Sequence, residues 1–209
     1  MKRGRFGRLG RPKSEEKREA ILEAAGELFL SLGLQGTSMD AVAERAGVSK
    51  QTVYSHFKNK EDLYRAVIVA KVESYGFAET ALPEDSDLDE ALCVMGRRFI
   101  DLMFDDEVIA MHRVVIGESV AHPKIAELFY ETGPGTTKRA IQRFLSAQAQ
   151  KRRLVIADLD YAAALFLSMV CGPYQMPLLL NRQPALASDF IDTHVRKAVA
   201  QFITLHRPS

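Results

Sequence analysis

The segment 37–63, TSMDAVAERAGVSKQTVYSHFKNKEDL, constrains the fold more than any other part of the chain. Thr37 and Asp40 match a Thr-x-x-Asp capping box, which predicts that a short helix begins here. Gly47 is expected to end that helix, and Ser49 is placed to cap the next one. About three residues therefore separate two helices, which is the connection that a helix-turn-helix requires.

The second of these helices carries a polar outer face. Val53 and Phe57 lie one turn apart and are expected to face the core. The remaining positions hold amide, hydroxyl and basic groups, which suit base edges and phosphates better than they suit plain solvent. They are Lys50, Gln51, Thr52, Tyr54 and His56. The alternative is a small helical hairpin packed in a core. Asn59 and Asp62 form another capping box, which places Lys60 in the first turn of a third helix, where phosphate is attracted.

At these residues the chain resembles the TetR/AcrR family of bacterial transcriptional regulators. The matching elements are Thr37, Ala46 to Ser49, Tyr54, Phe57 and Lys60 to Leu63, and the strong resemblance covers about residues 14 to 64. The resemblance implies base contacts by Lys50, Gln51 and Thr52, and phosphate contacts by Thr37, Tyr54, His56 and Lys60. The segment from Arg113 to Phe144 resembles the AefR-like subgroup of C-terminal domains.

The charge distribution agrees with a basic DNA-binding end. Residues 1–60 hold 12 Lys or Arg against 7 Asp or Glu, whereas residues 61–209 hold 16 against 20. Residues 1–13 include six basic side chains and no acid, which predicts a flexible arm. Arg5, Arg8 and Arg11 could enter a minor groove beside the helix-turn-helix, or the arm could be a solubilising tail.

The spacing of apolar residues predicts an all-α chain. We expect a flexible basic arm at 1–13, a three-helix DNA-binding domain at 14–59, a connecting lever helix at 60–82, and a helical ligand-binding and dimerisation domain at 83–209. The first helix should begin at Ser14 and stop at Gly33, and the lever helix should run to about Glu79. Further helices are expected near 88–104, 106–120, 123–131, 136–151, 158–180 and 188–206, the first capped by Asp87. Pro173 and Pro177 should kink or split the fifth.

Two groups of apolar residues in the C-terminal half have more than one explanation. One group suits either the interior of a monomer or a helix pair shared between subunits, and the resemblance implies a four-helix dimer interface. Its members are Leu165, Met169, Phe190, Val195, Val199 and Phe202. The other is either plain core or the lining of a ligand cavity. Its members are Met95, Phe99, Met103, Met111, Phe129, Phe144 and Phe166, with His112, Arg113 or Tyr174 available to orient a polar end.

Signals for enzymatic chemistry are missing from the sequence. His112 and His122 are ten residues apart with no Glu-x-x-His or Asp-rich companion, and no nucleophile elbow or phosphate-binding loop occurs. Cys93 and Cys171 are far apart, which favours two reduced thiols. The apolar stretch from Tyr161 to Cys171 is too short for the roughly 20 residues that span a bilayer. We therefore expect a cytoplasmic protein with no catalytic residues, no metal and no cofactor.

These observations predict a homodimeric, ligand-responsive transcriptional regulator. The expected protein is a repressor that binds a palindromic operator in double-stranded DNA and is released by a small, mainly apolar or aromatic effector. The alternative is an all-helical ligand-binding or catalytic protein whose basic N-terminal unit does not bind DNA.

Overall fold

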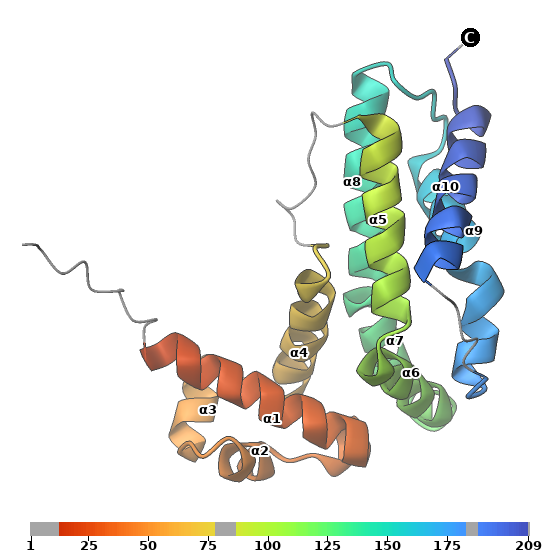
Figure 1. The fold of residues 1–209 in the computed structure, drawn as a ribbon. Helices are drawn as coiled ribbons and strands as arrows, with labels where there is room; N and C mark the ends of the chain where they lie inside the picture. The colour runs from red at the N-terminus through yellow and green to blue at the C-terminus, as the bar shows by residue number, and fades with distance from the viewer. Residues whose placement is uncertain (1–12, 78–86, 183–187, 209) are drawn as a thin grey trace, which may run out of the picture. The chain divides into compact units, whose positions relative to one another are not determined.

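The computed structural model describes residues 13–77, 87–182 and 188–208, and the secondary structure within these ranges is helical (Figure 1). The predicted all-α class is confirmed. The described residues form two compact units that meet in sequence between Val67 and Ile68, and each is described by itself. The helices are α1 (Lys13–Gly36), α2 (Met39–Arg45), α3 (Lys50–His56), α4 (Lys60–Ser74), α5 (Leu88–Met103), α6 (Asp106–Glu118), α7 (Pro123–Thr132), α8 (Pro134–Gln150), α9 (Leu159–Leu179) and α10 (Ser188–Leu205).

The first unit packs α1, α2, α3 and the beginning of α4 around one apolar centre. Ile21, Ala25 and Phe29 follow one face of α1 and are fully buried. The ring of Phe29 meets Tyr64 edge to face, with 5.1 Å between centroids. Val53 anchors α3 in the same interior. Burial of one large apolar side chain contributes about 1.5 to 3 kcal/mol to the free energy of unfolding. Loss of any one of these side chains should therefore strongly destabilise this small unit.

The start of α2 differs from the sequence prediction. Ser38, not Thr37, is the N-cap, and its hydroxyl accepts a hydrogen bond from the N–H of Ala41 at 3.1 Å. The Thr37 hydroxyl instead donates to the carbonyl of Gly33 at 2.8 Å and is buried. Gly33 was predicted to end the first helix; it has φ of 68° and kinks α1, because glycine tolerates this conformation, and the helix resumes to end at Gly36.

The second unit is built on a bundle of α5, α8, α9 and α10, with α6 and α7 crossing at one end (Figure 1). The interior of the bundle is aromatic and aliphatic, and Phe166 meets Phe202 edge to face at 5.3 Å between centroids. The helices α5 and α10 approach closely at Gly96. A Cβ atom there would lie 2.9 Å from Cγ1 of Val195, so the residue must be small.

Several helix ends depart from the predicted ones. The helix α4 ends at Ser74 rather than near Glu79, because Gly76 follows with φ of 81°. The expected side-chain cap by Asp87 is wrong, since its carboxylate makes no capping hydrogen bond. Residues 78–82 of the expected lever lie outside the described ranges.

The longest helix of the bundle, α9, continues through both of its prolines. Pro173 and Pro177 were expected to kink or split it, and the expected split is wrong, since one helix runs from Leu159 to Leu179. Within the described ranges it is the one helix long and apolar enough to span a membrane by length and composition. The apolar stretch from Tyr161 to Cys171 is too short to span a bilayer, but the helix around it has 21 residues. The core helix of a soluble protein passes the same test, and Phe166 and Val170 of α9 belong to the core.

Candidate nucleic-acid interface

The helix α3 presents most of its polar side chains outward, as the sequence predicts. Ser49 is its N-cap, accepting a hydrogen bond from the N–H of Thr52 at 3.1 Å. Val53 and Phe57 turn inward and are buried, while Gln51 is exposed and Tyr54 retains 47% of its accessible surface. A capped, seven-residue helix with one anchored face holds its outer side chains in a fixed register.

Lys50 at the beginning of α3 is held by an acidic partner. Its ammonium lies 2.7 Å from one carboxylate oxygen of Asp40 and donates to the other at 2.9 Å. The hydrogen bond to Asp40 raises the pKa of Lys50. The ammonium also lies 6.0 Å from the centroid of the Tyr54 ring. The sequence did not predict the pairing of Asp40 with Lys50, because only the fold brings α2 beside the beginning of α3.

The remaining expected DNA contacts have different surroundings. Lys60 donates to the carbonyl of Gln35 at 3.2 Å and is half-buried, although an ammonium has three donors and one contact does not exhaust them. The Thr37 side chain is buried, so in this conformation its hydroxyl is not available for the expected contact with a phosphate. His56 and Thr52 are half-buried on α3. Arg5, Arg8 and Arg11 lie outside the described residues.

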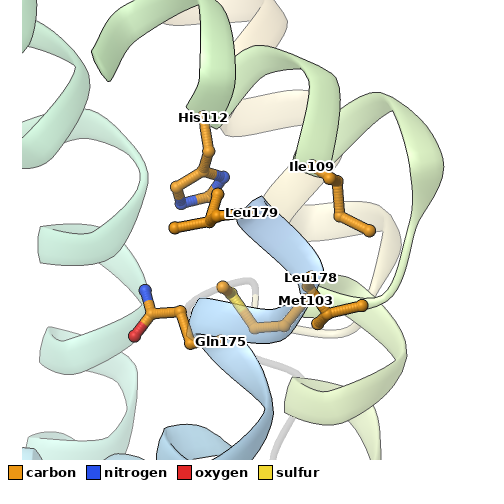
Figure 2. A pocket seen from close by; sticks show the side chains of 6 residues that line it. All are labelled: Met103, Ile109, His112, Gln175, Leu178 and Leu179. Atoms are coloured by element: carbon orange, nitrogen blue, oxygen red, sulfur yellow. The ribbon is translucent and has the colours of Figure 1, made fainter. Parts of the chain in front are cut away.

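A small hollow in the second unit brings together part of the predicted ligand site. It is partly open to solvent and small, with about 10 Å³ of space for a water-sized molecule, which is room for about one water. Its wall comes from the end of α5, from α6 and from the end of α9 (Figure 2). The lining residues are Met103, Ile109, His112, Gln175, Leu178 and Leu179. Met103 and His112 were predicted, whereas the other four were missed, because the apolar pattern of α9 gives no sign of which turn meets α6.

The other residues of the predicted cavity lie elsewhere. Met95, Phe144 and Phe166 belong to the buried core of the bundle, as the plain-core alternative expects. The Arg113 guanidinium donates to the carbonyls of Leu178 at 2.7 Å and Leu179 at 3.1 Å. The Arg113 side chain therefore caps the carboxyl end of α9, where the helix dipole favours a cation.

The remaining aromatic candidates contact other rings. Tyr174 packs edge to face against Phe104 and against His194, with centroids at 6.0 and 5.1 Å. Phe99 meets Phe77 at 6.5 Å between centroids. Phe129 and Met111 are buried, and Phe129 meets the ring of His112. These residues are not among those that line the hollow, although Phe129 contacts the lining residue His112.

A cluster of charged and hydroxyl groups joins the end of α4 to the beginning of α6. Asp105 caps α6 by accepting from the N–H groups of Glu107 at 2.9 Å and Val108 at 3.1 Å. Its carboxylate also accepts from the Tyr75 hydroxyl at 2.7 Å and lies 2.8 Å from the Lys71 ammonium. Burial and the hydrogen bond to Asp105 raise the pKa of Tyr75 to about 12.

The predicted dimer residues divide into two groups. Val195, Val199 and Phe202 are buried in the core of the chain itself, as the alternative of a monomer interior expects, and they are not exposed for contact with a partner. They form the inner stripe of α10 and face α5 and α9. Phe190 retains 52% of its accessible surface, and Leu165 and Met169 are partly exposed on α9.

The described residues hold no cluster of three or more His, Cys, Asp or Glu side chains suited to a metal ion. Cys93 and Cys171 are free thiols. Burial raises the pKa of Cys93 and raises that of Cys171 to about 12. A thiol with a raised pKa is a poor nucleophile at neutral pH, because little thiolate is present.

Comparison with known proteins places both units in one family. Residues 21–67 match the model for bacterial regulatory proteins of the tetR family, and residues 90–208 match the C-terminal domain of AefR-like transcriptional repressors. The transcriptional activator FasR of Mycolicibacterium smegmatis is 32% identical over 114 residues, covering 54% of this chain and 51% of FasR. The regulator TtgR of Pseudomonas putida is 28% identical over 115 residues, covering 55% and 54%. This chain thus spans about half the length of these curated relatives.

Solved structures resemble the chain over nearly its whole length. A flavonoid-responsive regulator, FrrA, shares 34% identity with a TM-score of 0.74, covering 93% of this chain and 98% of FrrA. A TetR-family regulator from Mesorhizobium loti has a TM-score of 0.75 at 24% identity, covering 95% and 100%, and at that identity it supports the fold alone. The relatives are regulators rather than enzymes. Because the AefR-like model alone matches more than half of the 209 residues, the chain belongs to the TetR family of bacterial regulatory proteins.

Proposed function

We propose that this DNA-binding regulator is a repressor that binds a palindromic operator as a homodimer and leaves it when a small, mainly apolar or aromatic effector binds. The observation that carries the DNA-binding part is the capped helix α3, whose inner residues are buried and whose Gln51 and Tyr54 are exposed. Major-groove base edges are read by donors and acceptors of this kind, and the cytoplasm is where such a protein meets the operator.

An exposed apolar face on the last two helices supports the homodimer. Tyr161, Leu165, Met169 and Met176 recur along α9 at spacings that share one face, and each is at least partly exposed. Phe190 adds an exposed aromatic ring from α10. A closed two-fold pair would bury such a face, and a palindromic operator is the natural target of a two-fold dimer.

Two features support a small aromatic effector. The hollow beside His112 has an apolar wall with few polar groups, which is the usual chemistry of a small-molecule site. FrrA, which resembles this chain over most of its length, is flavonoid-responsive. The helix α4 has residues on both sides of the boundary between Val67 and Ile68, so it is the element through which we expect ligand binding to change operator affinity.

Base reading is tested by measuring the affinity of variants for the operator and for random DNA. Gln51→Ala should weaken operator binding by about 1 to 3 kcal/mol and leave random DNA almost unchanged, if the amide reads a base edge. Lys60→Ala is the contrasting variant, and it should weaken both DNAs alike and lower the salt slope by about one unit. Equal losses on both DNAs for Gln51→Ala would reassign Gln51 to phosphate contact. Absence of any operator complex would favour a ligand-binding protein without a DNA role.

The dimer is tested by analytical ultracentrifugation. Met169→Asp places a charge on the partly exposed face of α9 and should produce folded monomers. Val199→Asp is the control, because Val199 is buried in its own subunit and its replacement should unfold the protein. A Met169→Asp protein that remains dimeric would place the interface elsewhere.

A further inference from the structure

The ammonium of Lys50 lies between an acidic and an aromatic side chain where α2 contacts α3 in the first unit (Figure 1). Asp40 belongs to the first turn of α2, and Lys50 is the first residue of α3. The two carboxylate oxygens of Asp40 lie 2.7 and 2.9 Å from Nζ of Lys50, and both side chains are more than half exposed. The Tyr54 ring, one turn further along α3, has its centroid 6.0 Å from the same ammonium. The ion pair therefore lies on the exposed face of α3 that also carries Tyr54.

The charge of Lys50 is not explained by the stability of α3. The beginning of a helix carries a partial positive charge, which disfavours a cation at that position. Asp40 compensates for this, because its hydrogen bond with the ammonium raises the pKa of Lys50 and favours the charged form. A role in DNA binding explains the ammonium better than helix stability does.

The contact with Asp40 leaves Lys50 with hydrogen-bonding capacity. An ammonium has three N–H donors. The two oxygens of Asp40 engage two of them at most, so at least one donor remains for an acceptor on DNA. The ammonium and the carboxylate together carry no net charge.

A phosphate and a base edge would meet the remaining donor differently. A phosphate oxygen that approaches Nζ of Lys50 also approaches the carboxylate of Asp40, and two anions repel each other. If Lys50 leaves Asp40 instead, it exchanges one anionic oxygen for another and gains little. The N7 and O6 atoms of guanine are neutral acceptors, so they can accept from the remaining donor while Asp40 keeps its own contacts.

We propose that Asp40 determines specificity at the DNA interface by holding the ammonium of Lys50. It withholds this charge from phosphates and leaves one donor for a base that offers a neutral acceptor in the major groove, such as guanine. Asp40 acts on DNA through Lys50, so it is a positioning residue rather than a base contact. The inference rests on the proposed reading of bases by α3.

The salt dependence of binding to random DNA tests the proposal. The affinity of the full-length protein is measured between about 50 and 200 mM salt. Asp40→Asn frees Lys50 for one phosphate, which should steepen the slope of log affinity against log salt by about 0.9. If wild type and variant bind equally at about 1 M salt, the variant binds random DNA roughly eightfold tighter at about 0.1 M. Operator affinity should rise less, because Lys50 already contacts a base there, so the ratio of operator to random affinity should fall.

The same substitution in a Lys50→Ala background shows whether Asp40 acts through Lys50. No ammonium is released in that background, so the steepening of the slope by Asp40→Asn should disappear. A slope that steepens equally in both backgrounds would overturn the proposal, because the carboxylate would then act by repelling DNA directly. Asp40→Ala removes the same charge with a different side chain and should repeat the result of Asp40→Asn.

Glu27→Gln is the matched control for net charge. Glu27 accepts a hydrogen bond from Nε of Arg45 at 2.7 Å, and both side chains are more than half exposed, so this is a second exposed ion pair of the same unit. Arg45 is not among the expected DNA contacts. Glu27→Gln should therefore keep the wild-type slope and ratio. An equal change in Glu27→Gln and Asp40→Asn would reject the proposal in favour of a general effect of net charge.

Operator binding separates this inference from the proposed function. If wild type binds operator and random DNA equally, the proposed base reading fails, while the slopes on random DNA still decide whether Asp40 withholds Lys50 from phosphates. If wild type prefers the operator but Asp40→Asn leaves the slope and the ratio unchanged, the role of Asp40 is rejected and base reading stands.

Discussion

Replacing Asp105 should destabilise the second unit more than breaking an ion pair on its surface. Asp105→Ala removes the N-cap of α6, which contributes about 1 kcal/mol. It also removes the acceptor of the Tyr75 hydroxyl, a hydrogen bond to a charged group that contributes about 1.5 to 3 kcal/mol. The ion pair with Lys71 adds at most about 1 kcal/mol, since Lys71 keeps Glu107 at 2.8 Å as a partner.

Together these losses amount to about 3 to 4 kcal/mol. In a protein of this size, 1 kcal/mol changes Tm by about 2 to 4 °C, so Asp105→Ala should lower it by roughly 10 °C. Asp105→Asn keeps an acceptor for the cap and for Tyr75 and loses the charge, so it should cost about 1 to 2 kcal/mol. The difference in stability between the two variants gives the combined contribution of the N-cap and of the hydrogen bond from the Tyr75 hydroxyl.

Calorimetry and thermal circular dichroism would check these values. Asp192→Asn is the control, because Asp192 is 54% exposed and pairs with Arg97 at the surface, where such pairs contribute about 0.2 to 1 kcal/mol. An Asp105→Ala protein that lies within about 0.5 kcal/mol of the wild type would refute the reasoning, because a cap is expected to cost at least that much.

The same carboxylate predicts the response to acid. Burial alone would raise the pKa of Asp105, but the hydrogen bonds from Lys71, Tyr75 and the Val108 N–H outweigh it and lower the pKa below 3.8. A lowered pKa stabilises the fold above the unfolded-state value, and this contribution is lost as the pH falls through the folded-state value. Wild type should therefore lose stability below about pH 4 more steeply than Asp105→Asn.

Three further predictions use the same thermal assay. Because burial lowers the pKa of His112, wild type should lose stability as the pH falls below 6.5, and His112→Phe should show a shallower loss. Gly96→Ala should destabilise, since its Cβ would lie 2.9 Å from Val195, whereas Gly117→Ala in α6 meets nothing within 4 Å and should stabilise by about 0.5 to 1 kcal/mol. Ser49→Ala removes the cap of α3 and should cost about 1 kcal/mol, and an unchanged Tm would show that the cap contributes little.

The sequence predicted helix ends well where local chemistry determines them. Gly33 and Ser49 act through their own backbone or side chain, so their roles could be assigned without a fold. The prediction failed where Ser38 competes with its neighbour Thr37 for the same cap. Both residues suit that role, and only the packing of Thr37 against the end of α1 decides between them.

Residues that act across the fold could not be predicted in this way. Val195, Val199 and Phe202 form a clear apolar stripe, but a stripe identifies a helix face and not the surface that covers it. In this protein the stripe is covered by the core of the chain itself. Likewise, Asp40 and Lys50 are ten residues apart, and their ion pair exists because the turn brings α2 beside α3.

The contact between Arg113 and the end of α9 restrains how far the hollow can open. Leu178 and Leu179 line the hollow with their side chains and bind Arg113 of α6 through their carbonyls. A molecule too large for the hollow must push these residues away from α6 and break both hydrogen bonds, each of which contributes about 1.5 to 3 kcal/mol when the donor is charged. The two hydrogen bonds of the guanidinium therefore oppose any widening of the hollow.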